Sequence, residues 1–272
     1  MAERILMVHA DLPPVVSWLL CTNRLDGQLT IAIESCLSQS FSDFDLVIVV
    51  NGPQATEIAD RLESTYHSDA RVVVIQTSIR HLNFSLSLGL HHARGRLVAR
   101  MDADDISHPD RLLRQVRFMD ENPEVVVLGS DYDVIDEAGR PIRRVHLPTT
   151  DTAIRRYLYR GNPLCHPSTM FRKAYIADLG GYLGGLHAED YDLWTRVAAD
   201  GSARFANLPV ACLGYRATPV GNARKSRSAY ANSAGSQLRN FISGNGLAWA
   251  GAALLSSFKA LIKSSRPKRI VP

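Results

Sequence analysis

Two aspartates, Asp102 and Asp104, stand two residues apart directly after an expected strand at residues 96–101. Side chains two apart on an extended chain point the same way, so both carboxylates are directed at one place. Hard divalent cations prefer such oxygen ligands. The spacing therefore predicts a metal site at Asp102 and Asp104, and a turn with solvated acids is the simpler alternative.

A third carboxylate, Asp190, begins a segment with helical spacing. The apolar residues three, four, seven and eight positions further on share a helical face with it: Leu193, Trp194, Val197 and Ala198. Asp190 is therefore expected to point inward, whereas Asp192 lies on another side, placed for an i,i+4 pair with Arg196. An inward carboxylate is a candidate general base. The alternative for Asp190 is a helix N-cap.

Strands and helices alternate over the first hundred residues. We expect strands at 15–20, 45–50, 71–76 and 96–101, with helices at 29–37, 56–66 and 86–93. This alternation predicts βαβ units and a parallel sheet, in which ligands bind beyond the carboxyl ends of the strands. Asn23, Asn51 and Asp102 each follow a strand directly, and together they indicate a nucleotide cleft.

The second half of the chain is less regular. We expect helices at 110–121, 152–159 and 190–199, strands at 125–128 and 168–171, and a hairpin turn at 136–139. Beyond about residue 216 the composition turns rich in Ser, Ala, Asn and Arg. The compact domain is therefore predicted to end there.

Three ordered stretches resemble family 2 inverting glycosyltransferases of the GT-A fold, of the type that assembles bacterial surface polysaccharides. They are 33–41 (IESCLSQSF), 99–112 (ARMDADDISHPDRL) and 189–194 (EDYDLW). The resemblance covers roughly residues 14–215. It implies an α/β, Rossmann-like, mostly parallel central sheet flanked by helices. Residues 1–215 would form the catalytic domain, with a nucleotide part at 14–105 and an acceptor part at 106–215, followed by a basic, partly amphipathic helical tail at 216–272.

The resemblance also implies a reaction. Asp102 and Asp104 would hold Mn²⁺ or Mg²⁺ on the diphosphate of a nucleotide-sugar, with a UDP-sugar as the default donor. Asp190 would take the proton of the acceptor hydroxyl, and one in-line displacement would invert the anomeric centre. The acceptor would be a glycan or a lipid-linked glycan in polysaccharide or lipopolysaccharide assembly.

The nucleotide pocket departs from the family pattern. Thr22, Arg24 and Asn51 are expected to line the nucleotide together with Asp102. The first strand ends Leu-Cys-Thr-Asn at 20–23, where the family has an aromatic residue for the base. The second ends Val-Asn-Gly-Pro at 50–53, where the family has an aspartate for uracil. A dTDP- or GDP-sugar therefore stays open as the donor.

His166 opens another stretch with a family resemblance, residues 166–172 (HPSTMFR). It precedes an expected strand, so its imidazole would stand beside the metal or the diphosphate. The alternative is a structural histidine whose hydrogen bonds are satisfied within the protein.

The C-terminal tail carries a separate signal. The chain has a net charge of +4, but no acidic residue follows Asp200, whereas eleven Lys and Arg residues do. One helical face of the tail is apolar, with cations beside it: Leu247, Gly251, Leu254, Leu255, Phe258, Leu261 and Ile262. This pattern predicts either contact with an anionic membrane or a helix packed on the domain or on a second subunit. Nucleic acid is not expected, because no aromatic residues alternate with the cations.

Three other functions compete with sugar transfer. A sugar nucleotidyltransferase would need a Gly-rich loop after the first strand, but residues 21–27 contain one glycine. A phosphatase with an aspartate nucleophile would carry its aspartates after the first strand rather than the fourth. A degenerate transferase acting as a binding partner is the non-enzymatic alternative. No convincing signal peptide is present, so we expect a cytoplasmic protein, peripheral at the inner face of the cell membrane if the tail binds lipid.

Overall fold

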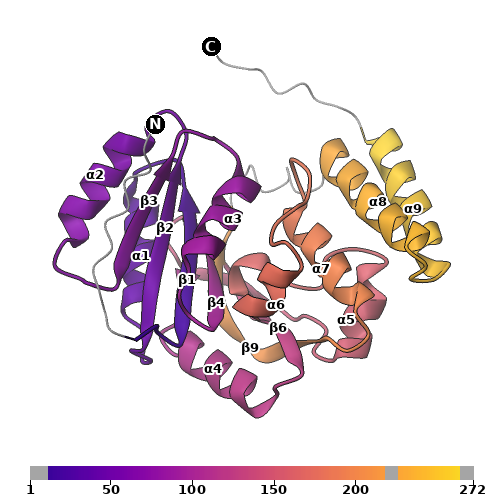
Figure 1. Cartoon of the computed structure of the whole chain (residues 1–272), viewed down its shortest axis with the longest axis horizontal. Coiled ribbons are helices and arrows are strands. Elements are labelled where there is room, and N and C mark those ends of the chain that lie inside the picture. Colours follow the sequence, from indigo (N-terminus) through magenta and orange to yellow (C-terminus); the bar gives the residue numbers. More distant parts are fainter. Residues whose placement is uncertain (1–11, 218–225, 264–272) are drawn as a thin grey trace.

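Four parallel strands form the N-terminal half of one sheet. The computed structural model describes residues 12–217 and 226–263. Within them the strand order is β3 (Val72–Thr77), β2 (Phe44–Asn51), β1 (Val16–Thr22) and β4 (Leu97–Asp102). Every residue of β1 and β2 is buried, because helices cover both faces of this part of the sheet. The predicted βαβ alternation is confirmed (Figure 1).

The helices divide between the two faces of the sheet. One face packs against α1 (Gly27–Leu37), α2 (Ala55–Tyr66) and α4 (Arg111–Glu121). The other packs against α3 (Leu82–His92), α5 (Asp151–Leu158), α6 (Lys173–Asp178) and α7 (Glu189–Ala199). Two of these helices begin at a side-chain N-cap, Asp26 for α1 and Thr150 for α5.

The C-terminal half of the sheet is mixed. Beyond β4 it continues with β8 (Met170–Arg172), β6 (Val125–Ile135), β9 (Arg204–Arg216) and β5 (Ile106–Ser107), and β7 (Pro141–Val145) pairs with β6. Only β6 and β9 pair in parallel here. The expected hairpin turn joins β6 to β7, where the Gly139 N–H donates to the Asp136 carbonyl.

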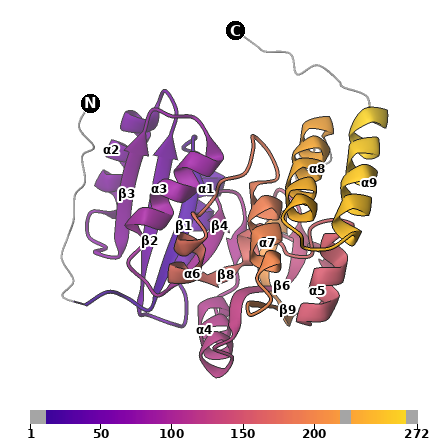
Figure 2. The same cartoon turned by 45° about the vertical axis from the view of Figure 1, so that its right-hand side comes forward.

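Several elements were not expected from the sequence, and the two longest of them are β9 and α8 (Arg227–Ile242). Strand β9 has no regular sequence pattern, because register shifts interrupt its ladder with β6 and its residues therefore do not alternate strictly between the two faces of the sheet. Helix α8 buries polar and small residues such as Ser236 and Gln237, so it lacks an apolar stripe. Together with α9 (Ala248–Ile262) it forms a helical pair beside α7 (Figure 2).

None of the helices in 12–217 and 226–263 combines the length and the apolarity that crossing a bilayer requires.

Candidate active site

An acidic turn begins at Asp102, the last residue of β4. Carboxylate oxygens of Asp102, Asp104 and Asp105 all lie within 4.8 Å of one another. The sequence predicted the first two, and Asp105 is an addition. The doubled aspartate was the available signal, but alternation along a strand places the side chain of Asp105 opposite to that of its neighbour. The turn departs from that geometry and brings the third carboxylate to the others.

Arg216, at the end of β9, holds the acidic turn. Its backbone N–H donates to Oδ1 of Asp105 at 2.8 Å, and its Nε donates to the Asp104 carbonyl at 2.7 Å. Nη1 donates to the carbonyls of Asp136 and Glu137, at 2.7 and 2.5 Å. Arg216 is itself buried. A strand that is distant in sequence therefore fixes the geometry of this turn.

Burial and mutual repulsion make it unfavourable for neighbouring carboxyls of the turn to carry a negative charge at the same time. Burial and the nearby Asp102 carboxylate raise the pKa of Asp104, and the same two causes raise that of Asp105 well above its ordinary value. Among the described residues, Oδ2 of Asp105 is buried with no hydrogen-bond partner. A divalent cation would relieve both the repulsion and the unsatisfied oxygen, so this donor set fits a hard metal ion.

Arg100 is a buried cation beside this turn. It is 2 % exposed and forms an ion pair with Asp102 through Nη1, while its Nε has no hydrogen-bond partner among the described residues. Burial disfavours the guanidinium charge, but neighbouring groups, of which the Asp102 carboxylate contributes most, together outweigh burial and raise the pKa of Arg100. A buried N–H without a partner is a donor available to an anionic ligand.

The predicted nucleotide-lining residues meet at the same edge of the sheet. The Thr22 hydroxyl donates to the Arg24 carbonyl at 2.8 Å and accepts from the Arg24 N–H at 3.2 Å. The Arg24 guanidinium lies 2.9 Å from Asp26 and 3.6 Å from Asp104. Asn51 ends β2 one residue beyond the level of Thr22, since Thr22 is in register with Val50. Loop, strand ends and acidic turn thus form one rim.

Asp190 is the second residue of α7 rather than its N-cap. The N-cap is Ala188, at φ 61°, and it makes no side-chain capping bond. Oδ1 of Asp190 accepts from the Tyr191 N–H at 2.7 Å, and Oδ2 accepts from Nδ2 of Asn162 at 2.6 Å. The N-cap alternative is therefore wrong. The sequence does not predict a role for Asn162, which lies in the loop after α5, because a single amide in a loop belongs to no periodic pattern or motif.

Glu189 lies beside Asp190 and has a different electrostatic environment. Burial raises the pKa of Glu189 to about 7, and the carboxylates of Asp190 and Asp102 add to the effect, while Arg100 opposes it. These influences mean that the first turn of α7 faces the acidic turn after β4. The predicted pair on the other side of α7 is confirmed, with Asp192 and Arg196 at 3.0 Å. That side is buried beneath α8.

His166 is packed inside the protein next to these carboxylates. Its Nε2 lies 3.0 Å from the Tyr182 hydroxyl, and its ring meets that of Trp194 edge-on at 6.1 Å. Burial raises the pKa of Tyr182, Arg100 opposes the shift, and Asp190 adds to it. His166 thus reaches the site through Tyr182, as a satisfied structural histidine would, and its role beside the metal stays a prediction.

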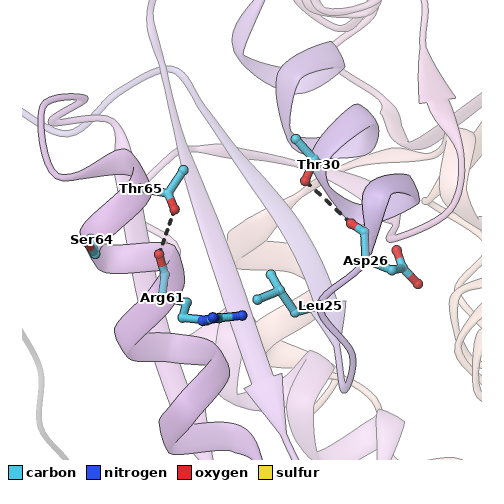
Figure 3. Close-up of a pocket in the computed structure, with 6 residues that line it drawn as sticks. All are labelled: Leu25, Asp26, Thr30, Arg61, Ser64 and Thr65. Atoms are coloured by element: carbon cyan, nitrogen blue, oxygen red, sulfur yellow. Dashed lines mark hydrogen bonds between the residues drawn. The ribbon is translucent and has the colours of Figure 1, made fainter.

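A separate hollow lies between α1 and α2, with a volume of about 470 Å³ (Figure 3). Its lining residues are Leu25, Asp26, Thr30, Arg61, Ser64 and Thr65. None of the predicted site residues lines it, although Leu25 and Asp26 directly follow Arg24. The chemistry-bearing side chains lie instead along the rim described above.

Comparison with known proteins adds independent findings. Residues 20–180 match the model of a family described as Glycosyl transferase family 2. The chain is 34% identical over 250 residues to the O-antigen biosynthesis glycosyltransferase WbnJ of Escherichia coli, covering 92% of this chain and 97% of that protein.

Two solved structures resemble the chain in fold. TarS 1-349 of S. aureus in complex with UDP-GlcNAc matches with a TM-score of 0.62 and 19% identity, over 82% of this chain and 66% of that one. The mannosyltransferase PcManGT from Pyrobaculum calidifontis, in complex with GDP-Man and Mn²⁺, matches with a TM-score of 0.66 and 16% identity, over 92% of this chain and 74% of that one.

Proposed function

The chain belongs to glycosyl transferase family 2, and from that premise we propose that it transfers a sugar from a nucleotide-sugar to a hydroxyl of a glycan acceptor. The family prediction and the predicted GT-A architecture are both confirmed. The similarity to WbnJ supports an acceptor in the assembly of a bacterial surface polysaccharide, either a glycan or a lipid-linked glycan.

One observation carries the proposal. The acidic turn after β4 and the first turn of α7 approach each other around Arg100. The guanidinium of Arg100 forms an ion pair with Asp102 and also counteracts the rise in the pKa of Glu189. We infer that the diphosphate and the hydroxyl that displaces it bind between the acids of the turn and the separate carboxylate of Asp190. This arrangement suits group transfer from a phosphorylated donor.

The donor is proposed to be a UDP-sugar. Thr22, Arg24 and Asn51 form the part of the rim that would contact the nucleoside. The amide of Asn51 both donates and accepts hydrogen bonds, so it can pair with a base edge that presents both kinds of group. The similar structures contain UDP-GlcNAc in one case and GDP-Man in the other, so a GDP-sugar is the competing donor.

Asp102 and Asp104 are proposed to hold Mn²⁺ or Mg²⁺, with Asp105 beside them. When bound, the metal ion would neutralise the negative charge that develops on the leaving diphosphate. Arg24, 3.6 Å from Asp104, and Arg100 add fixed positive charge at the same place. The diphosphate can then depart without being protonated.

Asp190 is proposed as the general base. The acceptor oxygen forms a bond to the anomeric carbon while the bond from that carbon to the diphosphate oxygen breaks on the opposite face. The configuration inverts, the hydroxyl proton moves to an Asp190 oxygen, and the electron pair of the broken bond leaves with the diphosphate. Asn162 and the Tyr191 N–H orient the Asp190 carboxylate for this role.

Thermal unfolding with nucleotides tests the binding half of the proposal. We would compare UDP, dTDP, GDP and CMP, each with and without Mn²⁺. At about one hundred times Kd, a ligand stabilises the folded state by about 2.7 kcal/mol, which raises Tm by roughly 5–10 °C. We expect this increase with UDP and metal, and its loss in Asp104→Ala.

The matched control is Asp43→Ala, an exposed aspartate just before β2, at the opposite edge of the sheet. It should retain the full increase in Tm. If GDP stabilises the protein in place of UDP, the donor assignment is wrong and the transferase proposal stands. If no nucleotide changes Tm in the presence of metal, the cleft is inactive and the chain is a degenerate transferase that serves as a binding partner.

A further inference from the structure

Helix α9 presents its larger apolar side chains to the outside. Its buried face, turned toward α8 and the domain, consists of small residues and one tryptophan: Trp249, Ala252, Ala253, Ser256 and Ala260. Trp249 is 4% exposed, with its ring 4.7 Å from that of Tyr159. A helix on the surface of a globular protein normally buries its large apolar residues and exposes small or polar ones.

The outer face of α9, which we call the α9 face, is continuous. Its six apolar members are Leu247 (81% exposed), Leu254 (73%), Leu255 (43%), Phe258 (58%), Leu261 (71%) and Ile262 (65%). At about 100° per residue they fall within roughly one third of the helix circumference. In both views α9 is the outermost helix, on the side of the molecule away from α2 (Figures 1 and 2). No other described element covers this face.

Cations border the α9 face. Lys259 and Lys263 follow Leu255 and Phe258 around the helix, and their ammonium nitrogens lie 5.8 and 5.7 Å from the centre of the Tyr230 ring on α8. Residues 217–272 contain nine Lys and Arg and no Asp or Glu. Whatever covers the face must therefore accept apolar side chains and also supply negative charge.

We propose that the α9 face docks on the surface of an anionic lipid bilayer. A helix whose apolar side chains enter the acyl boundary, with lysines beside the headgroups, satisfies both requirements at once. A second copy of this chain fits less well, because it would bring together two surfaces that are both positive and without acids. The inference rests on α9 and its charges, and it holds whether or not the proposed sugar transfer is correct.

Co-sedimentation with vesicles tests the docking surface. The full chain would be mixed with phosphatidylcholine vesicles, with or without phosphatidylglycerol, at low and at high salt. We expect binding to the anionic vesicles that weakens as salt rises. Phe258→Glu and Leu261→Glu should each lower the partition coefficient at least about tenfold, because they place a charge within the acyl boundary.

Two further variants separate the contributions. Lys259→Glu combined with Lys263→Glu should reduce binding to anionic vesicles at least about tenfold, since each lysine near such a surface contributes roughly fivefold. The matched control is Leu113→Glu on α4, where the leucine is 48% exposed. It should bind like the unaltered chain. Unchanged Tm values would show that the variants fold, as expected for exposed positions.

Two results would overturn the proposal. One is equal binding of the unaltered chain to vesicles with and without phosphatidylglycerol, or to neither. The other is a dimer in sedimentation equilibrium that Phe258→Glu converts to a monomer while no lipid is bound, because a second copy would then cover the α9 face. Neither measurement requires a sugar nucleotide, so the result is independent of the donor experiment.

Discussion

At the scale of single residues, two adjacent carboxyls at the start of α7 lie in different surroundings. Asp190 accepts hydrogen bonds from the Tyr191 N–H and from Asn162, which together orient its carboxyl group. Glu189 is held closer to neutral, because burial raises its pKa to about 7. The proposed base is thus held in place by two hydrogen bonds, beside a neighbour that titrates near neutral pH.

The first prediction concerns the base. Asp190→Asn keeps the size and the Asn162 contact but removes the proton acceptor, so the rate of sugar transfer should fall by about a thousandfold. The increase in Tm caused by UDP and metal should remain. The measurement is the initial rate of nucleotide release with acceptor present. Glu189→Gln is the comparison: if it abolishes transfer and Asp190→Asn does not, Glu189 is the base.

A second prediction concerns pH and stability. Because the pKa of Glu189 is about 7 in the folded protein and ordinary in the unfolded chain, the folded state binds the proton more tightly. The free energy of unfolding should therefore decrease as pH rises from about 4.5 to 7. Glu189→Gln removes this dependence. Measured by chemical denaturation, the free energy of unfolding of this variant should exceed that of the unaltered protein by about 2–3 kcal/mol at pH 8 and equal it at pH 4.5. An equal difference at both pH values would contradict this explanation.

At the scale of elements, the acidic turn depends on β9. Arg216 is a buried cation at the end of this strand, and three carbonyls receive its guanidinium hydrogen bonds: those of Asp104, Asp136 and Glu137. The strand thereby ties the turn after β4 to the hairpin between β6 and β7. Metal binding at Asp104 is therefore expected to be sensitive to a residue that does not touch the metal.

Arg216→Ala tests this coupling. The variant leaves three carbonyls without their charge-assisted hydrogen bonds, so the free energy of unfolding should fall by about 2–4 kcal/mol. The metal-dependent increase in Tm with UDP should also shrink. Arg204→Ala, at the other end of β9, is the control and should change stability by less than about 1 kcal/mol. Loss of stability with full nucleotide binding would mean that the turn keeps its shape without Arg216.

At the scale of the whole molecule, the pair formed by α8 and α9 is joined to α7 by buried polar contacts of α8. Asp192 on α7 accepts hydrogen bonds from Ser236, at 2.9 Å, and pairs with Arg239, at 2.8 Å. Gln237 donates to the Tyr191 hydroxyl at 2.6 Å. The division of the chain into a domain at 1–215 and a tail at 216–272 remains a proposal, and these contacts give it a direct test.

A chain ending after Ala217 provides that test. The truncation would expose Asp192 and the surface around Tyr159 on which Trp249 packs. We therefore expect Tm to fall by at least about 5–10 °C and the truncated chain to aggregate more readily. Trp249→Ala in the full chain should reproduce part of the loss, about 3 kcal/mol. If the truncated chain melts at the temperature of the full chain, residues 1–215 form an autonomous domain and the helical pair is an accessory.

The amino-acid sequence by itself determined the parallel half of the sheet and the place of its ligand edge. Apolar runs such as 45–50, punctuated by turn residues, indicate strands buried on both faces, and such strands occur in parallel sheets between helices. Because the carboxyl ends of parallel strands meet at one edge, Thr22, Asn51 and Asp102 had to lie near one another. The acidic pair and the apolar stripe of α9 are likewise periodic patterns that depend only on local chain geometry, whereas the outward orientation of that stripe is a result of the tertiary packing.

The tertiary structure alone decided which distant polar groups complete the site. Arg216 meets Asp105, Asn162 meets Asp190, and α8 covers the side of α7 that carries Asp192. Each of these is a single contact between segments far apart in the chain, made by polar or small residues without periodicity. Sequence patterns report how a segment partitions between core and water. They do not report which partner satisfies a buried hydrogen bond, because that depends on how the elements are packed together.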